Sequence, residues 1–190
     1  MRGINLLSRR INLPALRWKI GAALVAAGLG IIVFAMVEPL PRTVAGVASV
    51  VDGDTLEIDG ARVRLAGIDA PELAQTCTDA GGAEWPCGTA ASERLGELIG
   101  TTALSCQIEE RDRYRRLVGV CEATGQDIGA LMVREGLALS AERHFALEQD
   151  ARSARRGIWV GAFEAPADYR ERTADDGFFD MLEQWMTLIE

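Results

Sequence analysis

The amino-acid sequence predicts an α+β fold: a small, mainly β barrel with helices attached to it. Five short segments have the residue pattern of strands. Asp59-Gly60 separates the second segment from the third and is a strong signal for a two-residue β-hairpin. One helical segment follows the third strand and two follow the fifth, an order that favours a small barrel over a parallel sheet.

The expected elements leave a turn-rich stretch at residues 73–88. The expected strands cover residues 43–51, 54–58, 61–68, 102–109 and 117–122. The expected helices cover residues 89–99, 127–135 and 145–156. Thr89 is the candidate N-cap of the first helix, and Gly136 is the expected end of the second. A domain over residues 43–160 follows, with an acidic amphipathic C-terminal tail over residues 161–190.

An uncharged, mostly apolar run at residues 20–37 is long enough to cross a bilayer as a helix. The residues before it are basic and include no acid, which favours a cytoplasmic N-terminus. We therefore expect residues 1–42 to form a basic segment, a membrane anchor and a linker. The domain would then be extracytoplasmic on a single-pass protein of the inner (cytoplasmic) membrane. Cleavage after Val33-Phe34-Ala35 is the alternative, and it would secrete the domain.

The charge of the domain and tail does not favour a tight nucleic-acid binder. Residues 43–190 carry 14 of the 20 basic residues and 27 of the 28 acidic ones, a net charge of −13. Such a charge repels polyanions at long range. One loop is locally basic and could steer a substrate; it contains Arg111, Arg113, Arg115 and Arg116.

All four cysteines follow the apolar run and would share an oxidising compartment; they are Cys77, Cys87, Cys106 and Cys121. Their spacing contains no C-x-x-C, which argues against a zinc site. Two disulfides can be connected in three ways. We prefer Cys77–Cys87 and Cys106–Cys121, because each would pin a local loop or strand pair, and four free buried thiols are the alternative.

The hairpin at residues 50–72 carries more charge than a hairpin needs. A turn at residues 59–60 would bring Asp54 and Asp69 together, and two adjacent carboxylates persist if a hard cation lies between them. Glu72 follows closely, and Arg64 offers the planar fork that suits phosphate. A cation, a carboxylate base and an arginine are the groups that attack on a phosphodiester requires. Solvated surface charges are the other interpretation. The chain's one histidine, His144, more often has a structural role.

Three sequence blocks together resemble the staphylococcal nuclease-like (thermonuclease) family: DGDT, RLAGIDAPE and DRYRRLVG. The resemblance covers about residues 45–159. It implies a five-stranded OB-type barrel with three helices. It also implies calcium-dependent cleavage of DNA or RNA phosphodiesters, with single-stranded nucleic acid as the partner; no protein partner follows from it.

The resemblance assigns roles to individual residues. Asp54 and Asp69 would bind calcium through their side chains, and Ala70 through its backbone carbonyl. Glu72 would be the general base. The phosphate would be bound by Arg64 and Arg116. Tyr114 would line the nucleotide pocket, beside Arg113 in the basic loop.

Two departures from the family pattern favour a second hypothesis. Arg115 stands where the family has glycine, so the loop that carries Arg116 could be rebuilt. The acidic balance also differs from that of a DNA binder. A non-catalytic barrel that acts in the cell envelope, for example in polysaccharide-related work, is therefore the alternative. The apolar residues of the tail, including Phe178 and Trp185, could pack on the barrel or dock on a partner or a membrane.

Overall fold

The computed structural model describes residues 42–175, all of which fall within one compact unit, Leu40–Glu190. The predicted anchor at residues 20–37 and the apolar tail residues from Phe178 onward lie outside the described residues. Within residues 42–175, none of the helices combines the length and apolar character that crossing a bilayer requires.

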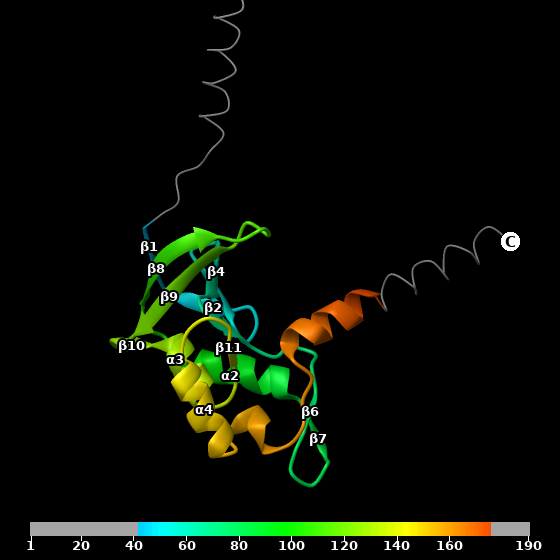
Figure 1. The fold of residues 1–190 in the computed structure, drawn as a ribbon. Coiled ribbons are helices and arrows are strands. Elements are labelled where there is room, and N and C mark those ends of the chain that lie inside the picture. Colours follow the sequence, from blue (N-terminus) through cyan, green and yellow to red (C-terminus); the bar gives the residue numbers. More distant parts are fainter. Residues whose placement is uncertain (1–41, 176–190) are drawn as a thin grey trace, which may run out of the picture. The chain divides into compact units, whose positions relative to one another are not determined.

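A mixed, curled sheet forms the body of the unit (Figure 1). Its strands are β1 (Thr43–Gly46), β2 (Ala48–Val50), β3 (Thr55–Ile58), β4 (Ala61–Leu65), β8 (Leu104–Arg111), β9 (Leu117–Ala123) and β10 (Gln126–Asp127). The order is β1-β8-β9-β4-β3-β2, with β10 paired to β9, and β4 and β9 run parallel. The other pairs are antiparallel.

The sheet curls because its two outer strands, β1 and β2, come from one continuous stretch of chain. β1 pairs with β8 at one end of the strand order and β2 pairs with β3 at the other. Val47 alone separates the two strands, so the two ends of the order must lie close together. The expected single strand at residues 43–51 is therefore two strands. The expected strand at residues 61–68 also divides, into β4 and β5 (Ile68–Asp69), after a turn at Gly67 with φ 73°.

The structure has more strands than the five that the sequence predicts. The expected strands at residues 43–51 and 61–68 each divide into two, and several short strand pairs are added. Beyond the main sheet, β5 pairs with β11 (Leu139–Ser140), and β6 (Cys77–Thr78) pairs with β7 (Glu84–Trp85). The expected Asp59-Gly60 hairpin is present, and both residues have positive φ, 50° and 79°.

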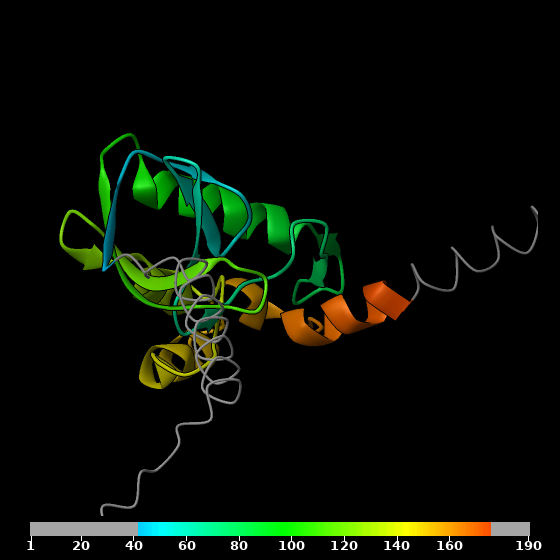
Figure 2. The ribbon, with the colours of Figure 1, turned by 90° about the horizontal axis from the view of Figure 1, so that it is seen from above.

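Three helices gather at one end of the sheet (Figure 1), as expected for an α+β fold. They are α2 (Cys87–Ile99), α3 (Ile128–Arg134) and α4 (Phe145–Ser153), followed by the 3₁₀ turn η1 (Gly157–Val160). A fourth helical segment at residues 166–175 belongs to the stretch expected to be a tail (Figure 2).

Two helix boundaries differ from the sequence prediction. α2 begins at Cys87, ahead of Thr89, whose hydroxyl donates to the carbonyl of Leu73 rather than capping the helix. α4 ends at Ser153, because Arg155 and Gly157 adopt positive φ and break the helix. α3 agrees closely: Asp127 caps it by accepting from the Ala130 N–H.

Both preferred disulfides are present, and the described residues hold no free cysteine. Cys106–Cys121 joins directly paired positions of β8 and β9 in the main core. Cys77–Cys87 ties the β6–β7 hairpin to the start of α2, inside a smaller core with Ile158 and Trp159. The loop that follows Glu72 is thereby anchored at its far end.

Candidate active site

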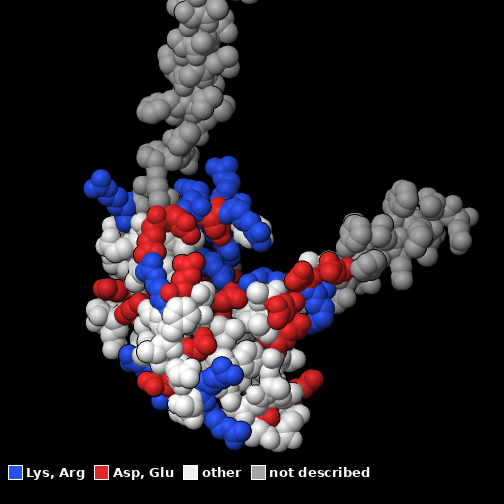
Figure 3. Space-filling model, in the orientation of Figure 1, with Lys and Arg blue, Asp and Glu red and all other residues white. Residues whose placement is uncertain are grey.

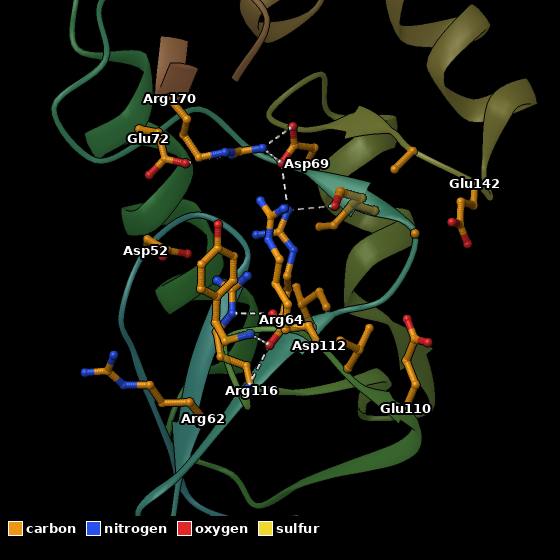
Figure 4. A pocket seen from close by; sticks show the side chains of 17 residues that line it. Asp52, Arg62, Arg64, Asp69, Glu72, Glu110, Asp112, Arg116, Glu142 and Arg170 are labelled. Carbon is orange, nitrogen blue, oxygen red and sulfur yellow. Dashed lines mark hydrogen bonds and ion pairs between the residues drawn. The ribbon is translucent and has the colours of Figure 1, made fainter. Parts of the chain in front are cut away.

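The register of the β3–β4 hairpin places Arg64 beside two carboxylates. Thr55 lies opposite Arg64, so Asp54, one residue earlier, lies next to the guanidinium. Arg64 Nη1 donates to Asp54 Oδ1 at 2.6 Å. Its Nη2 donates to Asp69 Oδ1, also at 2.6 Å (Figure 4). The two predicted carboxylates therefore converge, with the guanidinium of Arg64 shared between them.

Asp54 is buried, with 3% of its surface exposed. Its carboxylate accepts from the Thr55 hydroxyl at 3.0 Å and from the Ala70 N–H at 3.2 Å. Burial raises the pKa of Asp54 to about 7, although the charge of Arg64 opposes the rise. Arg64 therefore compensates the charge of the ionised Asp54 only in part, and a cation at the site would stabilise the ionised form.

The backbone around Glu72 is held from two sides. Its N–H donates to Oε1 of Gln75 at 3.1 Å, and the Gln75 N–H donates back to the Glu72 carbonyl at 2.7 Å. A Cβ at Gly88 would lie 1.7 Å from that same carbonyl oxygen, so the first turn of α2 packs directly on this turn. Buried Gln75 and Gly88 thus fix where the Glu72 side chain starts.

The loop at residues 112–116 reaches the hairpin through the parallel β4–β9 pair. Val118 lies opposite Arg64, so Arg116, two residues before Val118, lies on the same face as Arg64 and two positions along from it. Asp112 accepts from the Arg116 N–H at 2.9 Å and from its Nε at 2.8 Å. Burial raises the pKa of Asp112, but these hydrogen bonds outweigh it and hold the pKa below its ordinary value. Asp112 therefore stays ionised and orients Arg116.

Arg115 does not displace its neighbour. It adopts φ 67°, the left-handed region that favours glycine, and its N–H donates to the Asp112 carbonyl. Tyr114 is 64% exposed, and two guanidinium groups lie near its ring. The Arg113 Cζ is 4.8 Å from the ring centroid and that of Arg116 is 5.4 Å from it.

Six of the predicted site residues line one cavity of about 900 Å³: Arg64, Asp69, Glu72, Arg113, Tyr114 and Arg116. Asp54 and Ala70 are buried beside it and joined to each other by a hydrogen bond. Among the lining residues are five arginines and six carboxylates, so the cavity is nearly balanced within an acidic domain. Figure 3 shows basic and acidic side chains interspersed on the face of the molecule that it draws.

Arg111, Arg115 and His144 do not line this cavity. Arg111 instead donates to the Arg115 carbonyl at 3.0 Å. His144 precedes α4, and its Nε2 lies 3.6 Å from Asp127 Oδ2, a position that fits the structural role expected for it.

The donor chemistry at Asp54 and Asp69 fits a hard cation such as calcium. The described residues contain no group of three or more acidic, histidine or cysteine side chains able to hold a metal. Water or backbone oxygens would therefore have to complete the shell. The Ala70 N–H donates to Asp54, and no contact of the Ala70 carbonyl tests its predicted role.

Sequence reasoning missed Arg170 and Gln75. Arg170 comes from the helical segment at residues 166–175, and its Nη1 donates to Glu72 Oε1 at 2.7 Å (Figure 4). Burial lowers the pKa of Arg170, but the hydrogen bond to Glu72 and the charge of Asp69 outweigh it, so the pKa is raised. No motif marks either residue: Arg170 contacts Glu72 across 98 positions of sequence, and Gln75 supports the Glu72 turn from within a turn-rich stretch.

Comparison with known proteins identifies relatives named as nucleases and one named for succinoglycan biosynthesis. The family model for the staphylococcal nuclease homologue matches residues 62–161. The succinoglycan biosynthesis protein ExoI of Rhizobium meliloti is 37% identical over 123 residues, which is 61% of this chain and 64% of that protein. A micrococcal nuclease of Shigella flexneri is 30% identical over 159 residues, 73% of this chain and 86% of that protein.

An uncharacterized endonuclease of Escherichia coli is 32% identical over 131 residues, 63% of this chain and 79% of that protein. The chain thus spans a little under two thirds of ExoI and more of the two nucleases. The match covers more than half of the chain and includes the segment from Arg64 to Arg116. The chain belongs to the staphylococcal nuclease family.

Proposed function

We propose that this protein is a calcium-dependent nuclease that hydrolyses phosphodiester bonds of single-stranded DNA or RNA. The observation that carries the proposal is the convergence of Arg64, Asp69, Glu72 and Arg116 on one cavity, with Asp54 beside it. The cavity combines phosphate-binding forks with carboxylates. Relatives named as nucleases support the same reaction class.

In this proposal Asp54 and Asp69 hold calcium, with the Ala70 carbonyl as a further ligand. When bound, calcium would neutralise charge on the phosphate and lower the pKa of a bound water. Glu72 accepts the proton of the attacking water. Arg64 and Arg116 bind the phosphate oxygens and stabilise the charge that develops on them. Tyr114 is exposed and lines the cavity, so a base could stack on its ring if it displaced one of the guanidinium groups near the ring.

We further propose that residues 20–37 anchor the protein in the inner membrane and that the nuclease domain is extracytoplasmic. The two disulfides support this placement, because disulfides persist in oxidising compartments.

Hydrolysis of labelled single-stranded DNA and RNA by the full chain tests the nuclease proposal. We expect cleavage with calcium and loss of cleavage with a chelator. The Arg94→Gln variant, which loses an arginine that pairs with Glu135 away from the cavity, should cleave in the same way as the wild type. Equal cleavage with and without the chelator would contradict the proposal.

A non-catalytic envelope protein is the second candidate. The relative ExoI, named for succinoglycan biosynthesis, favours it, as does the occupation of all three site carboxylates by arginine. Calcium binding without hydrolysis of any nucleic acid, measured together with binding to an acidic polysaccharide, would support this candidate over the nuclease.

A further inference from the structure

Arg170 enters the cavity from outside the segment that matches the family. The match ends at residue 161, and Arg170 lies on the helical segment at residues 166–175. Its Nη1 donates to Glu72 Oε1 at 2.7 Å, and its Nη2 lies 3.1 and 3.2 Å from the two oxygens of Asp69. One side chain thus engages both the proposed base and a proposed calcium ligand.

The chain that carries Arg170 is tied to the site. Gln75, which holds the Glu72 turn, also donates from Nε2 to the Glu164 carbonyl at 2.7 Å. The Ala162 N–H donates to the Thr78 hydroxyl at 3.0 Å, and the Thr78 N–H donates to the Ala162 carbonyl. Pro166 follows at the first helical position, where proline is favoured. The helix that carries Arg170 therefore starts at a fixed place beside Glu72.

The contact between Arg170 and Asp69 conflicts with cation binding. Both Asp69 oxygens accept from Arg170, and one of them also accepts from Arg64. A cation that uses Asp69 needs these same oxygens and repels a guanidinium next to them. The Arg170 side chain is 41% exposed and borders solvent, whereas that of Arg64 is 19% exposed and bonded to two carboxylates. Arg170, rather than Arg64, is therefore the side chain that leaves Asp69 when a metal cation binds.

A guanidinium that leaves Asp69 remains in a cavity lined by Arg64 and Arg116. Its planar fork can then pair with a phosphate oxygen pair as it pairs with a carboxylate. We propose that Arg170 is a third phosphate-binding arginine, which covers Asp69 and Glu72 in the free protein and passes to a substrate phosphate when a cation binds. This inference rests on the proposed function.

Calcium titration of the full chain by calorimetry tests the first half of the exchange. Arg170→Gln removes the competitor, so we expect calcium to bind about fivefold more tightly, the factor that one partly exposed ion pair represents. Arg172→Gln is the matched control: it removes the same charge from the same helix, where Arg172 pairs with Glu164. We expect its calcium affinity to equal that of the wild type.

Binding of a non-cleavable, single-stranded phosphorothioate oligonucleotide in saturating calcium tests the second half. We expect Arg170→Gln to weaken this binding about tenfold, the loss of one charge-assisted contact, and Arg172→Gln to leave it unchanged. Arg170→Lys keeps the charge without the fork, so its affinity should lie between those of the wild type and Arg170→Gln.

The proposed passage of Arg170 from the carboxylates to a phosphate requires both the tighter calcium binding and the weaker oligonucleotide binding of Arg170→Gln. An Arg170→Gln chain with wild-type calcium affinity, or with wild-type affinity for the oligonucleotide, overturns it. Failure of the proposed function looks different: the wild type would bind the oligonucleotide and show both Arg170 effects, yet leave unmodified DNA and RNA intact.

Discussion

Arg64 donates a 2.6 Å hydrogen bond from Nη1 to Oδ1 of Asp54, a carboxylate that is otherwise buried in the core of the domain. Asp54 is one of three polar residues among the buried side chains of the described chain, with Thr55 and Gln75. The pair compensates a buried charge and holds Arg64 at the cavity, where the proposed function requires a phosphate-binding arginine.

Removal of Arg64 should destabilise the protein as well as inactivate it. Arg64→Gln leaves the Asp54 charge buried without its main partner, a loss that costs about 2–3 kcal/mol for a partly buried pair. Urea unfolding at pH 8 with a chelator measures this loss. Arg62→Gln, on the same strand but without a buried partner, is the control, and equal stability of the two variants would contradict the interpretation.

The raised pKa of Asp54 predicts a specific pH dependence of stability. At pH values below about 4 Asp54 is protonated in both folded and unfolded chains, and the fold carries no penalty. As the pH rises toward 7 only the unfolded chain loses the proton readily, so the folded state becomes relatively less stable. The penalty is complete above pH 7.

Asp54→Asn should therefore be more stable than the wild type in chelator, by a margin that grows from pH 4 to pH 7 to at most about 4 kcal/mol. Added calcium at pH 8 should stabilise the wild type and not this variant. Chemical unfolding at several pH values measures the margin, and a margin independent of pH would be inconsistent with the burial argument.

Arg115 occupies a conformation that costs a non-glycine residue about 1 kcal/mol. Arg115→Gly should accordingly be about 1 kcal/mol more stable than Arg115→Ala, which removes the same charge but keeps the strain. Thermal unfolding compares the two variants. Equal melting temperatures would show that this loop does not need the left-handed conformation. We expect nuclease activity to be retained in the glycine variant, because Asp112 still orients Arg116.

The Cys106–Cys121 disulfide closes a loop with a sequence separation of 15. The chain-entropy estimate for such a loop is about 3 kcal/mol. A Cys106→Ala, Cys121→Ala double variant should lose about this much stability in a denaturant titration. The variant should keep the site geometry, since neither cysteine lines the cavity. Loss of activity without loss of stability would argue against a purely structural role.

Much of the site could be predicted because its main parts are local in sequence. Asp59-Gly60 specifies a two-residue hairpin, and that hairpin alone determines that Arg64 returns beside Asp54. The cysteine pairs followed from the same local reasoning. Arg116 could be assigned only through the family resemblance, since the parallel β4–β9 pair that delivers it joins distant segments.

The remaining features of the fold and the site depend on packing contacts that no local sequence pattern predicts. The bend at Val47 separates β1 from β2; it follows Gly46, but a single glycine inside a strand-like pattern does not specify that the chain bends there. Gln75 and Arg170 reach Glu72 through a loop and a helix whose positions follow from packing around Cys77–Cys87. The prediction of an acidic amphipathic tail rested on its apolar residues and gave no reason to single out Arg170, which lines the cavity.

The cleavage rate of the Glu72→Gln variant tests most directly whether these residues form one phosphodiesterase site. It should be compared with the wild type on 5′-labelled single-stranded DNA in calcium, after circular dichroism has shown that both are folded. We predict that the variant binds the DNA but cleaves it at least about a hundredfold more slowly, as expected for loss of a general base. A Glu72→Gln chain that cleaves DNA at the wild-type rate would contradict the account.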